Sequence, residues 1–155
     1  IRIGGVTAHY APATDTIHLP HASAFVTEDA RIATLCHELA HHTGAAHRLD
    51  RLKDYFTDRA ARAKEELIAE ISSAVICAMI GLKPDHIEDH AAYVKDWLSL
   101  LTADPRAFLS AAAKAQAAVD WLIAKAGDPA DARHVADTGS RAAQDGAPSA
   151  SAVSP

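Results

Sequence analysis

The first 44 residues change from an alternating pattern of apolar positions to a helical one. Strand-forming residues at 6–10 and 16–19 flank a segment containing Pro and Asp, which predicts a β-hairpin. From residue 28 the apolar positions follow the spacing of a helix that ends near Thr43. Thr27 suits the N-cap of this helix, and Gly44 suits the C′ position just beyond its last turn.

Three further stretches have apolar residues at helical spacing. One covers 67–79 and is ended by Gly81 and Pro84, the next covers 87–101, and the last begins near Pro105 and continues to about residue 122. Residues 45–60 are charged and irregular, which predicts a surface loop with at most a short helix. Acids are interleaved with the arginines between Arg48 and Arg62, so this cluster is interpreted as a solvated loop.

These elements predict an α+β fold that is mostly helical, in which a short N-terminal hairpin packs on the first helix and three further helices follow. We expect residues 1–127 to form one domain. Residues 128–155 are rich in Ala, Ser and Pro and have few large apolar side chains, so we expect a flexible tail there.

Composition narrows the function classes. The chain has 155 residues, of which 49% are hydrophobic, and a formal net charge of −5, which gives no general attraction to nucleic acid or to an anionic membrane. Both cysteines lie in apolar helical patterns, and Cys36 is predicted to be a buried thiol rather than part of a disulfide, which favours the cytoplasm. No apolar run is long enough to cross a membrane. The chain begins at Ile1 within a strand region, so we expect it to be part of a longer protein.

The first helix carries the sequence His37-Glu-Leu-Ala-His41. Residues four apart share a helical face, so His37 and His41 can bind one metal ion, which we predict to be zinc, although Mn²⁺ or Co²⁺ would accept the same ligands. Glu38 is rotated by about 100° from His37 on an α-helix. It therefore lies outside the ligand pair, and we predict that it is the general base that takes a proton from water.

Two kinds of residue can supply the third ligand. His47 completes the metzincin spacing HExxHxxGxxH, but a metzincin also needs a methionine turn, and the single methionine, Met79, is better explained as a core residue. The segment Lys64-Glu-Glu-Leu-Ile-Ala-Glu70 offers carboxylates on the next helix. Of a pair on one helical face, one can bind the ion while the other orients a ligand histidine. We favour Glu66, with His47, Glu70 and Glu65 as alternatives.

Several separate motifs resemble one known family. They include Tyr10-Ala-Pro-Ala-Thr-Asp-Thr-Ile-His-Leu-Pro20, the segments 37–44, 48–51 and 64–70, Asp89-His-Ala-Ala-Tyr-Val-Lys-Asp-Trp97, and 113–118. Together they resemble the C-terminal metallopeptidase domain of ArdC-type antirestriction proteins, over about residues 3–125. The chain departs from the family pattern at His42, where an aromatic residue is usual, and in a shorter loop after Arg51.

The resemblance implies a zincin-like fold and a gluzincin-like site with His37, His41 and Glu66 as ligands and Glu38 as general base. It also implies a role in protecting plasmid or phage DNA from restriction enzymes, with single-stranded DNA bound only by an N-terminal domain that this chain lacks. We therefore expect a zinc metallopeptidase whose protein substrate is unknown. The alternative function is a metal-stabilised, non-catalytic domain that engages a restriction-system or partner protein.

Overall fold

The computed structural model describes residues 1–82 and 91–127, apart from the side chains of 91–96. The chain divides into two compact units, Ile1–Leu122 and Ile123–Pro155, and the fold described below is that of the first unit. The predicted tail over 128–155 and the predicted start of the third helix at residue 87 lie outside the described residues.

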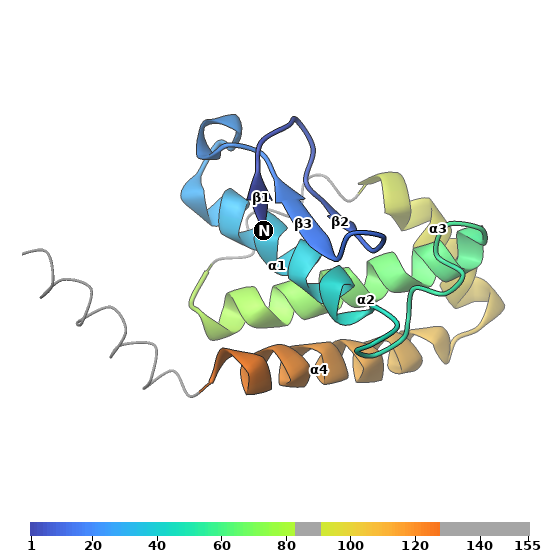
Figure 1. Ribbon diagram of the computed structural model, residues 1–155. Coiled ribbons are helices and arrows are strands. Elements are labelled where there is room, and N and C mark those ends of the chain that lie inside the picture. Colours follow the sequence, from blue (N-terminus) through green and yellow to red (C-terminus); the bar gives the residue numbers. More distant parts are fainter. Residues whose placement is uncertain (83–90, 128–155) are drawn as a thin grey trace, which may run out of the picture. The chain divides into compact units, whose positions relative to one another are not determined.

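A small sheet forms the N-terminal part of the fold (Figure 1). It has three strands, β1 (Arg2–Ile3), β2 (His9–Ala11) and β3 (Thr16–Leu19), in the order β1-β3-β2. The predicted hairpin is β2 and β3, which pair antiparallel with Tyr10 opposite Ile17. The parallel pairing of β1 with β3 was not predicted, because a strand of two residues is too short to show an alternation of apolar and polar positions. Tyr10 and Ile17 pack against Leu35 and Leu39 of the first helix, so the sheet lies on that helix.

The first helix, α1, runs from Glu28 to Thr43, as the sequence predicts. Thr27 caps it by accepting a hydrogen bond from the Ala30 amide at 3.0 Å. Gly44 is the C-cap of the helix, one position before the predicted C′, and has a φ of −78°. A Cβ at Gly44 would lie 3.0 Å from Leu52 Cγ and 3.2 Å from Arg51 Nη2. Glycine is therefore favoured here by the close approach of the following loop.

The second helix, α2 (Arg59–Met79), packs along α1 and holds the carboxylates of the candidate site. It starts after Asp58, whose side chain accepts hydrogen bonds from the amides of the first turn. Figure 1 shows α2 between α1 and the fourth helix, and two serine hydroxyls link these helices. Ser73 Oγ donates to Ala33 O of α1 at 3.1 Å, and Ser72 Oγ lies 3.5 Å from Ala115 O.

The remaining helices are α3 (Ala91–Ala103) and α4 (Ala107–Ala126). Fully buried Ala111 and Ala115 of α4 pack against Leu67 and Ile68 of α2. Small side chains on α4 let its backbone come close to α2, which explains why an alanine-rich chain still builds a core. The predicted fold class, α+β with four helices and a small sheet, is confirmed.

Predictions for single apolar residues had mixed outcomes. Cys36 is buried, as predicted. Trp97 packs at the edge of the α2–α4 core. Met79 is 60% exposed at the end of α2, so its predicted place in the core is wrong. The helical pattern continues to Met79, where α2 ends.

The loop 45–58 contains turns and no regular helix, and its arginines contradict the sequence interpretation. The side chains of Arg48 and Arg51 are only 8% and 5% exposed. Each forms a bidentate ion pair with a carboxylate far away in the sequence, Asp15 for Arg48 and Glu65 for Arg51. These pairs attach the loop to the hairpin and to α2. Among the described residues, no helix is long and apolar enough to cross a membrane.

Candidate metal centre

Two histidines of α1 face one carboxylate of α2. His37 Nε2 and His41 Nε2 lie 3.1 Å apart, and Glu66 Oε2 lies 3.5 Å from each of them. His41 and Glu66 are buried, and His37 is half-buried. The spacing of four residues brings the two imidazoles together, and the packing of α2 on α1 brings the carboxylate to them. Within the described residues, these three form the group that could hold a metal ion.

The chemistry and spacing of these atoms suit a divalent ion. Two imidazole nitrogens and one carboxylate oxygen are the donor set of catalytic zinc sites that keep one position open. For a tetrahedral ion with bonds of about 2.0–2.1 Å, the ligand atoms are about 3.3 Å apart. The observed separations of 3.1 and 3.5 Å bracket this value.

Each histidine has a second carboxylate behind it. His41 Nδ1 lies 3.4 Å from Glu65 Oε1, and His37 Nδ1 lies 3.1 Å from Glu70 Oε1. Both imidazoles therefore present Nε2 to the centre of the site and Nδ1 to an acidic partner. Such a partner fixes the ring and makes its other nitrogen a stronger ligand.

The carboxylates control the charge of the histidines. Burial alone lowers the pKa of His37, but hydrogen bonds to Glu66 and Glu70 outweigh it and raise this pKa to about 10. The pKa of His41 is also raised, since Glu65 and Glu66 outweigh its burial. Burial raises the pKa of Glu66, yet both histidines lower it well below its usual range.

Arg51 fixes the position of Glu65. Its Nε donates to Glu65 Oε2 at 3.0 Å and its Nη2 to Oε1 at 2.9 Å. The same guanidinium donates to Ala40 O at 2.8 Å and to Thr43 Oγ1 at 3.0 Å at the end of α1. One arginine thus connects the loop, the last turn of α1 and the acidic face of α2.

A cleft of about 250 Å³ opens in front of the three candidate ligands. Glu38 lines it and is 7% exposed. Residues His9 and Tyr10 of β2 form one wall, and Tyr55 and Phe56 of the loop form another. Within the described part of the chain, β2 is an edge strand of the sheet, and two of its residues line this cleft.

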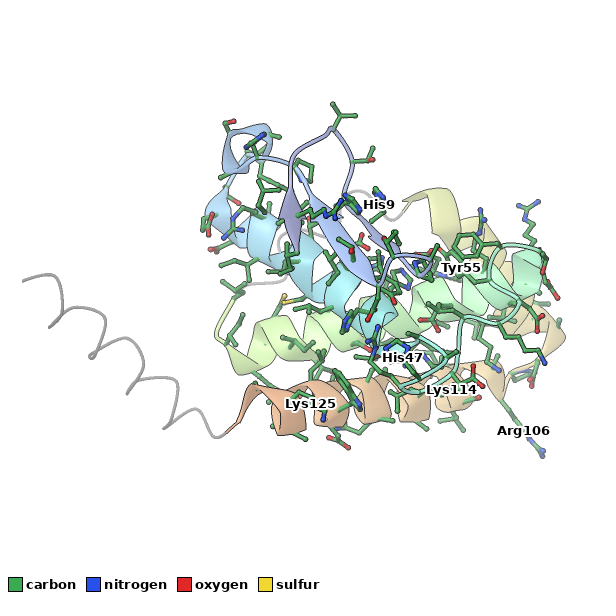
Figure 2. The ribbon with its side chains drawn as sticks, viewed as in Figure 1. His9, His47, Tyr55, Arg106, Lys114 and Lys125 are labelled. Atoms are coloured by element: carbon green, nitrogen blue, oxygen red, sulfur yellow. The ribbon has the colours of Figure 1, made fainter. Side chains whose placement is uncertain are left out.

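The alternative ligand His47 lies elsewhere. Its side chain is 64% exposed, and its Nε2 lies 3.4 Å from Asp15 Oδ2, on the outer side of the loop. Figure 2 shows His47 beyond the end of α1, whereas Tyr55 lies further along the loop beside α2. The structure therefore groups Glu66, and not His47, with His37 and His41. Glu65 and Glu70 lie on the Nδ1 sides of the imidazoles.

Sequence reasoning missed two residues near the site, Tyr55 and Arg51. The Tyr55 hydroxyl donates to Glu66 Oε1, and its ring meets His41 edge-on, with the centroids 5.7 Å apart. Both residues lie in a charged loop whose fold the apolar pattern does not describe. Their placement depends on turns that bring residues 51 and 55 back to α2.

The fold and this site define a class of protein. Residues 1–114 match the family described as zincin-like metallopeptidase, and the chain belongs to this family. Its fold is similar to that of the antirestriction protein ArdC of plasmid R388, with a TM-score of 0.75 and 43% identity to the Mn(II)-bound crystal structure. That match covers 83% of this chain and 48% of ArdC. The metal-free ArdC structure gives a TM-score of 0.69 over 77% of this chain and 43% of that one.

Two curated proteins have similar identity. The uncharacterised protein y4eC of Sinorhizobium fredii is 43% identical over 128 residues, which are 83% of this chain and 42% of y4eC. The DNA primase TraC of Escherichia coli is 42% identical over 117 residues, which are 76% of this chain and 11% of TraC. The chain therefore spans less than half the length of each of these relatives. The predicted resemblance to ArdC-type proteins is confirmed.

Proposed function

We propose that this domain is a zinc-dependent peptidase of an antirestriction-type protein. The observation that carries the proposal is the position of Glu38. It lies in the wall of a cleft that also contains His37, His41 and Glu66. A carboxylate at this point is not needed to hold the ion, but it is placed to act on water and substrate in the cleft.

The proposed ion is one Zn²⁺ held by His37, His41 and Glu66. The donor set and the spacing of its atoms support this choice. The Mn(II)-bound structure of ArdC supports a divalent ion in the relative, and Mn²⁺ or Co²⁺ would accept the same donors. When bound, zinc supplies Lewis acidity, which polarises a carbonyl group and makes a coordinated water more acidic.

In this proposal the chain's own residues bind the peptide and move the proton. Glu38 accepts the proton of the attacking water and later delivers it to the leaving amine. The outer edge of β2 offers unpaired backbone groups to an extended peptide, which would add as a further strand. Tyr55 keeps Glu66 oriented through its hydroxyl hydrogen bond.

The antirestriction role rests on the relatives. ArdC is described as an antirestriction protein, and 43% identity over 83% of this chain supports a related role for the protein that contains this domain. We propose that single-stranded DNA, if the whole protein binds it, is bound outside this domain, since the chain has a net charge of −5.

A second candidate is a metal-stabilised, non-catalytic domain that engages a restriction-system or partner protein. One observation favours it. The names of the relatives describe antirestriction and primase functions, and none describes proteolysis. The three candidate ligands would then serve to order α1 against α2.

Glu38→Gln in the full-length protein separates the two candidates. We expect this variant to keep its zinc, to cleave fluorescent casein or purified restriction subunits about 10²–10⁴-fold more slowly, and to lose DNA protection. Glu28→Gln on the exposed first turn of the same helix is the matched control. If Glu38→Gln binds zinc and still protects DNA fully, the second candidate replaces the first.

A further inference from the structure

Arg51 forms an ion pair with Glu65, on the Nδ1 side of His41. Its side chain is 5% exposed, and that of Glu65 is 3% exposed. The pair is therefore buried away from water. A carboxylate buried in this way without a cation beside it would be strongly unfavourable.

The contacts form a continuous chain from Arg51 to a candidate ligand. Glu65 Oε1 accepts from Arg51 Nη2 at 2.9 Å and lies 3.4 Å from His41 Nδ1. Because Arg51 Nε also donates to the other oxygen, the plane of the carboxylate is fixed by two parallel hydrogen bonds. The oxygen that faces His41 therefore cannot turn away without breaking a buried bidentate pair.

Arg51 also fixes the backbone that carries His41. Its Nη2 donates to Ala40 O, the carbonyl just before His41, and its Nη1 donates to Thr43 Oγ1. The guanidinium reaches these atoms through the space left by Gly44, whose missing Cβ would be 3.2 Å from Nη2. The end of α1 and the Glu65 carboxylate are thus oriented by the same planar guanidinium group.

We propose that Arg51 is a positioning residue of the metal centre, which acts through Glu65 to hold the His41 imidazole in its metal-binding orientation. The inference rests on the proposed metal site and adds to it a residue outside the cleft. A lysine cannot replace Arg51 fully, since an ammonium cannot span both carboxylate oxygens and two acceptors of α1 in one plane.

Arg48 provides the internal comparison. It is also almost buried, also makes a bidentate ion pair, and also attaches the loop to another element. Its carboxylate partner, Asp15, contacts Tyr10 and lies near His42 and His47, and none of these belongs to the group His37, His41 and Glu66. Arg48 Nε also donates to His42 O at the end of α1, so Arg48 shares with Arg51 a contact to this helix end but not a contact to a carboxylate that faces His41. Loss of Arg48 therefore removes a similar structural contact without touching the metal centre.

The test is a double-mutant cycle in the full-length protein with Arg51→Ala, Glu65→Gln and their combination. Zinc affinity is measured by competition with a fluorescent chelator, and the absorption spectrum of the Co²⁺-loaded protein reports the ligand arrangement. Arg51→Ala is expected to weaken zinc binding about 10–100-fold. Glu65→Gln should produce a similar loss and a similar change in the Co²⁺ spectrum, and the double variant should bind no more than about twofold more weakly than Glu65→Gln alone. Arg48→Ala should bind zinc like the wild type.

Three results would overturn the proposal: wild-type zinc affinity in Arg51→Ala, additive losses in the double variant, or an equal loss in Arg48→Ala. If Arg51→Ala does not fold, Arg51→Lys replaces it in the same cycle and is read by the same criteria. A wild-type protein that binds neither zinc nor Co²⁺ would instead contradict the proposed metal site. Normal zinc binding by wild type and Arg51 variants alike would leave the proposed function intact and exclude the positioning role.

Discussion

Asp15 in the hairpin turn and Arg48 in the loop after α1, 33 residues apart, form a bidentate ion pair on the surface of the fold. The Tyr10 hydroxyl donates to the same carboxylate at 2.7 Å, and Arg48 Nη2 donates to the Tyr10 oxygen at 2.9 Å. Arg48 thereby ties the sheet to the end of α1. It also holds the Tyr10 side chain at the wall of the cleft.

This pair predicts a dependence of stability on pH. Hydrogen bonds from Arg48 and Tyr10 hold the pKa of Asp15 well below its usual range. Because its pKa in the folded state is the lower one, its stabilising contribution is present above the unfolded pKa of about 3.9 and is lost as the pH falls below that value. Asp15→Asn should therefore lower the free energy of unfolding at pH 7 by about 1 kcal/mol, a modest effect because Asp15 is 43% exposed.

Urea unfolding of wild type and Asp15→Asn at pH 7 and pH 3, both with chelator, measures this effect. The difference between the two proteins should shrink at pH 3. Asp29→Asn, which changes an exposed carboxylate in the first turn of α1, is the control. An equal difference at both pH values would contradict the role given to Asp15.

The ligand assignment predicts which histidine and which glutamate matter for metal content. Glu66→Ala should lose zinc affinity by at least about 100-fold, because it removes one of three donors from a buried site. His47→Ala should retain wild-type zinc content, since His47 lies on the exposed side of the loop. Zinc stoichiometry after dialysis measures both, and zinc lost only in the His47 variant would reverse the assignment.

The close approach at Gly44 predicts a clash without backbone strain. Gly44→Ala places a Cβ 3.0 Å from Leu52 Cγ, 3.1 Å from His41 O and 3.2 Å from Arg51 Nη2, while φ stays at an ordinary −78°. We expect a loss of about 1–3 kcal/mol in the free energy of unfolding and weaker zinc binding, because Arg51 must shift.

Gly81→Ala is the contrast for that variant. Gly81 has a φ of +79° and open space around it, so the substitution strains the backbone far from the metal centre. Thermal unfolding should show a loss for both variants, but the zinc competition assay should respond to Gly44→Ala only. If Gly44→Ala binds zinc like the wild type, the Arg51 guanidinium can shift without disturbing the metal centre, and this prediction is wrong.

The contact between α2 and α4 predicts intolerance of larger side chains. Ala115 is 1% exposed and its carbonyl lies 3.5 Å from Ser72 Oγ, so Ala115→Leu should destabilise the fold by about 1–3 kcal/mol. Ala113→Leu on the exposed face of the same helix should change stability by less than about 0.5 kcal/mol. Denaturant unfolding compares the stability of the two variants. Equal losses of stability would contradict the close contact between α2 and α4 at Ala115.

The parts of this fold in which apolar residues recur at regular spacing could be predicted from the sequence. The bounds of α1, its Thr27 cap and the hairpin depend on spacing within one element. Glu66 was favoured on a motif of the next helix and on the family resemblance, since spacing alone also allowed His47, Glu65 and Glu70. The burial of Arg48 and Arg51 could not be predicted, because each finds its carboxylate only after the loop has folded back. Charge in a loop indicates solvent exposure unless the partner is known.

The three carboxylates of α2 also decide how α2 aligns with α1. Both helices bury small side chains, among them Ala40 of α1 and Ala63 and Ala69 of α2, so apolar contact alone would discriminate only weakly against a slide of α2 along α1 by one turn. A slide of one turn would bring Arg62 or Glu70 to the place of Glu66, and would leave Glu65 without Arg51. The buried charges therefore select one helix register, so that the chemistry of the site also specifies the fold that contains it.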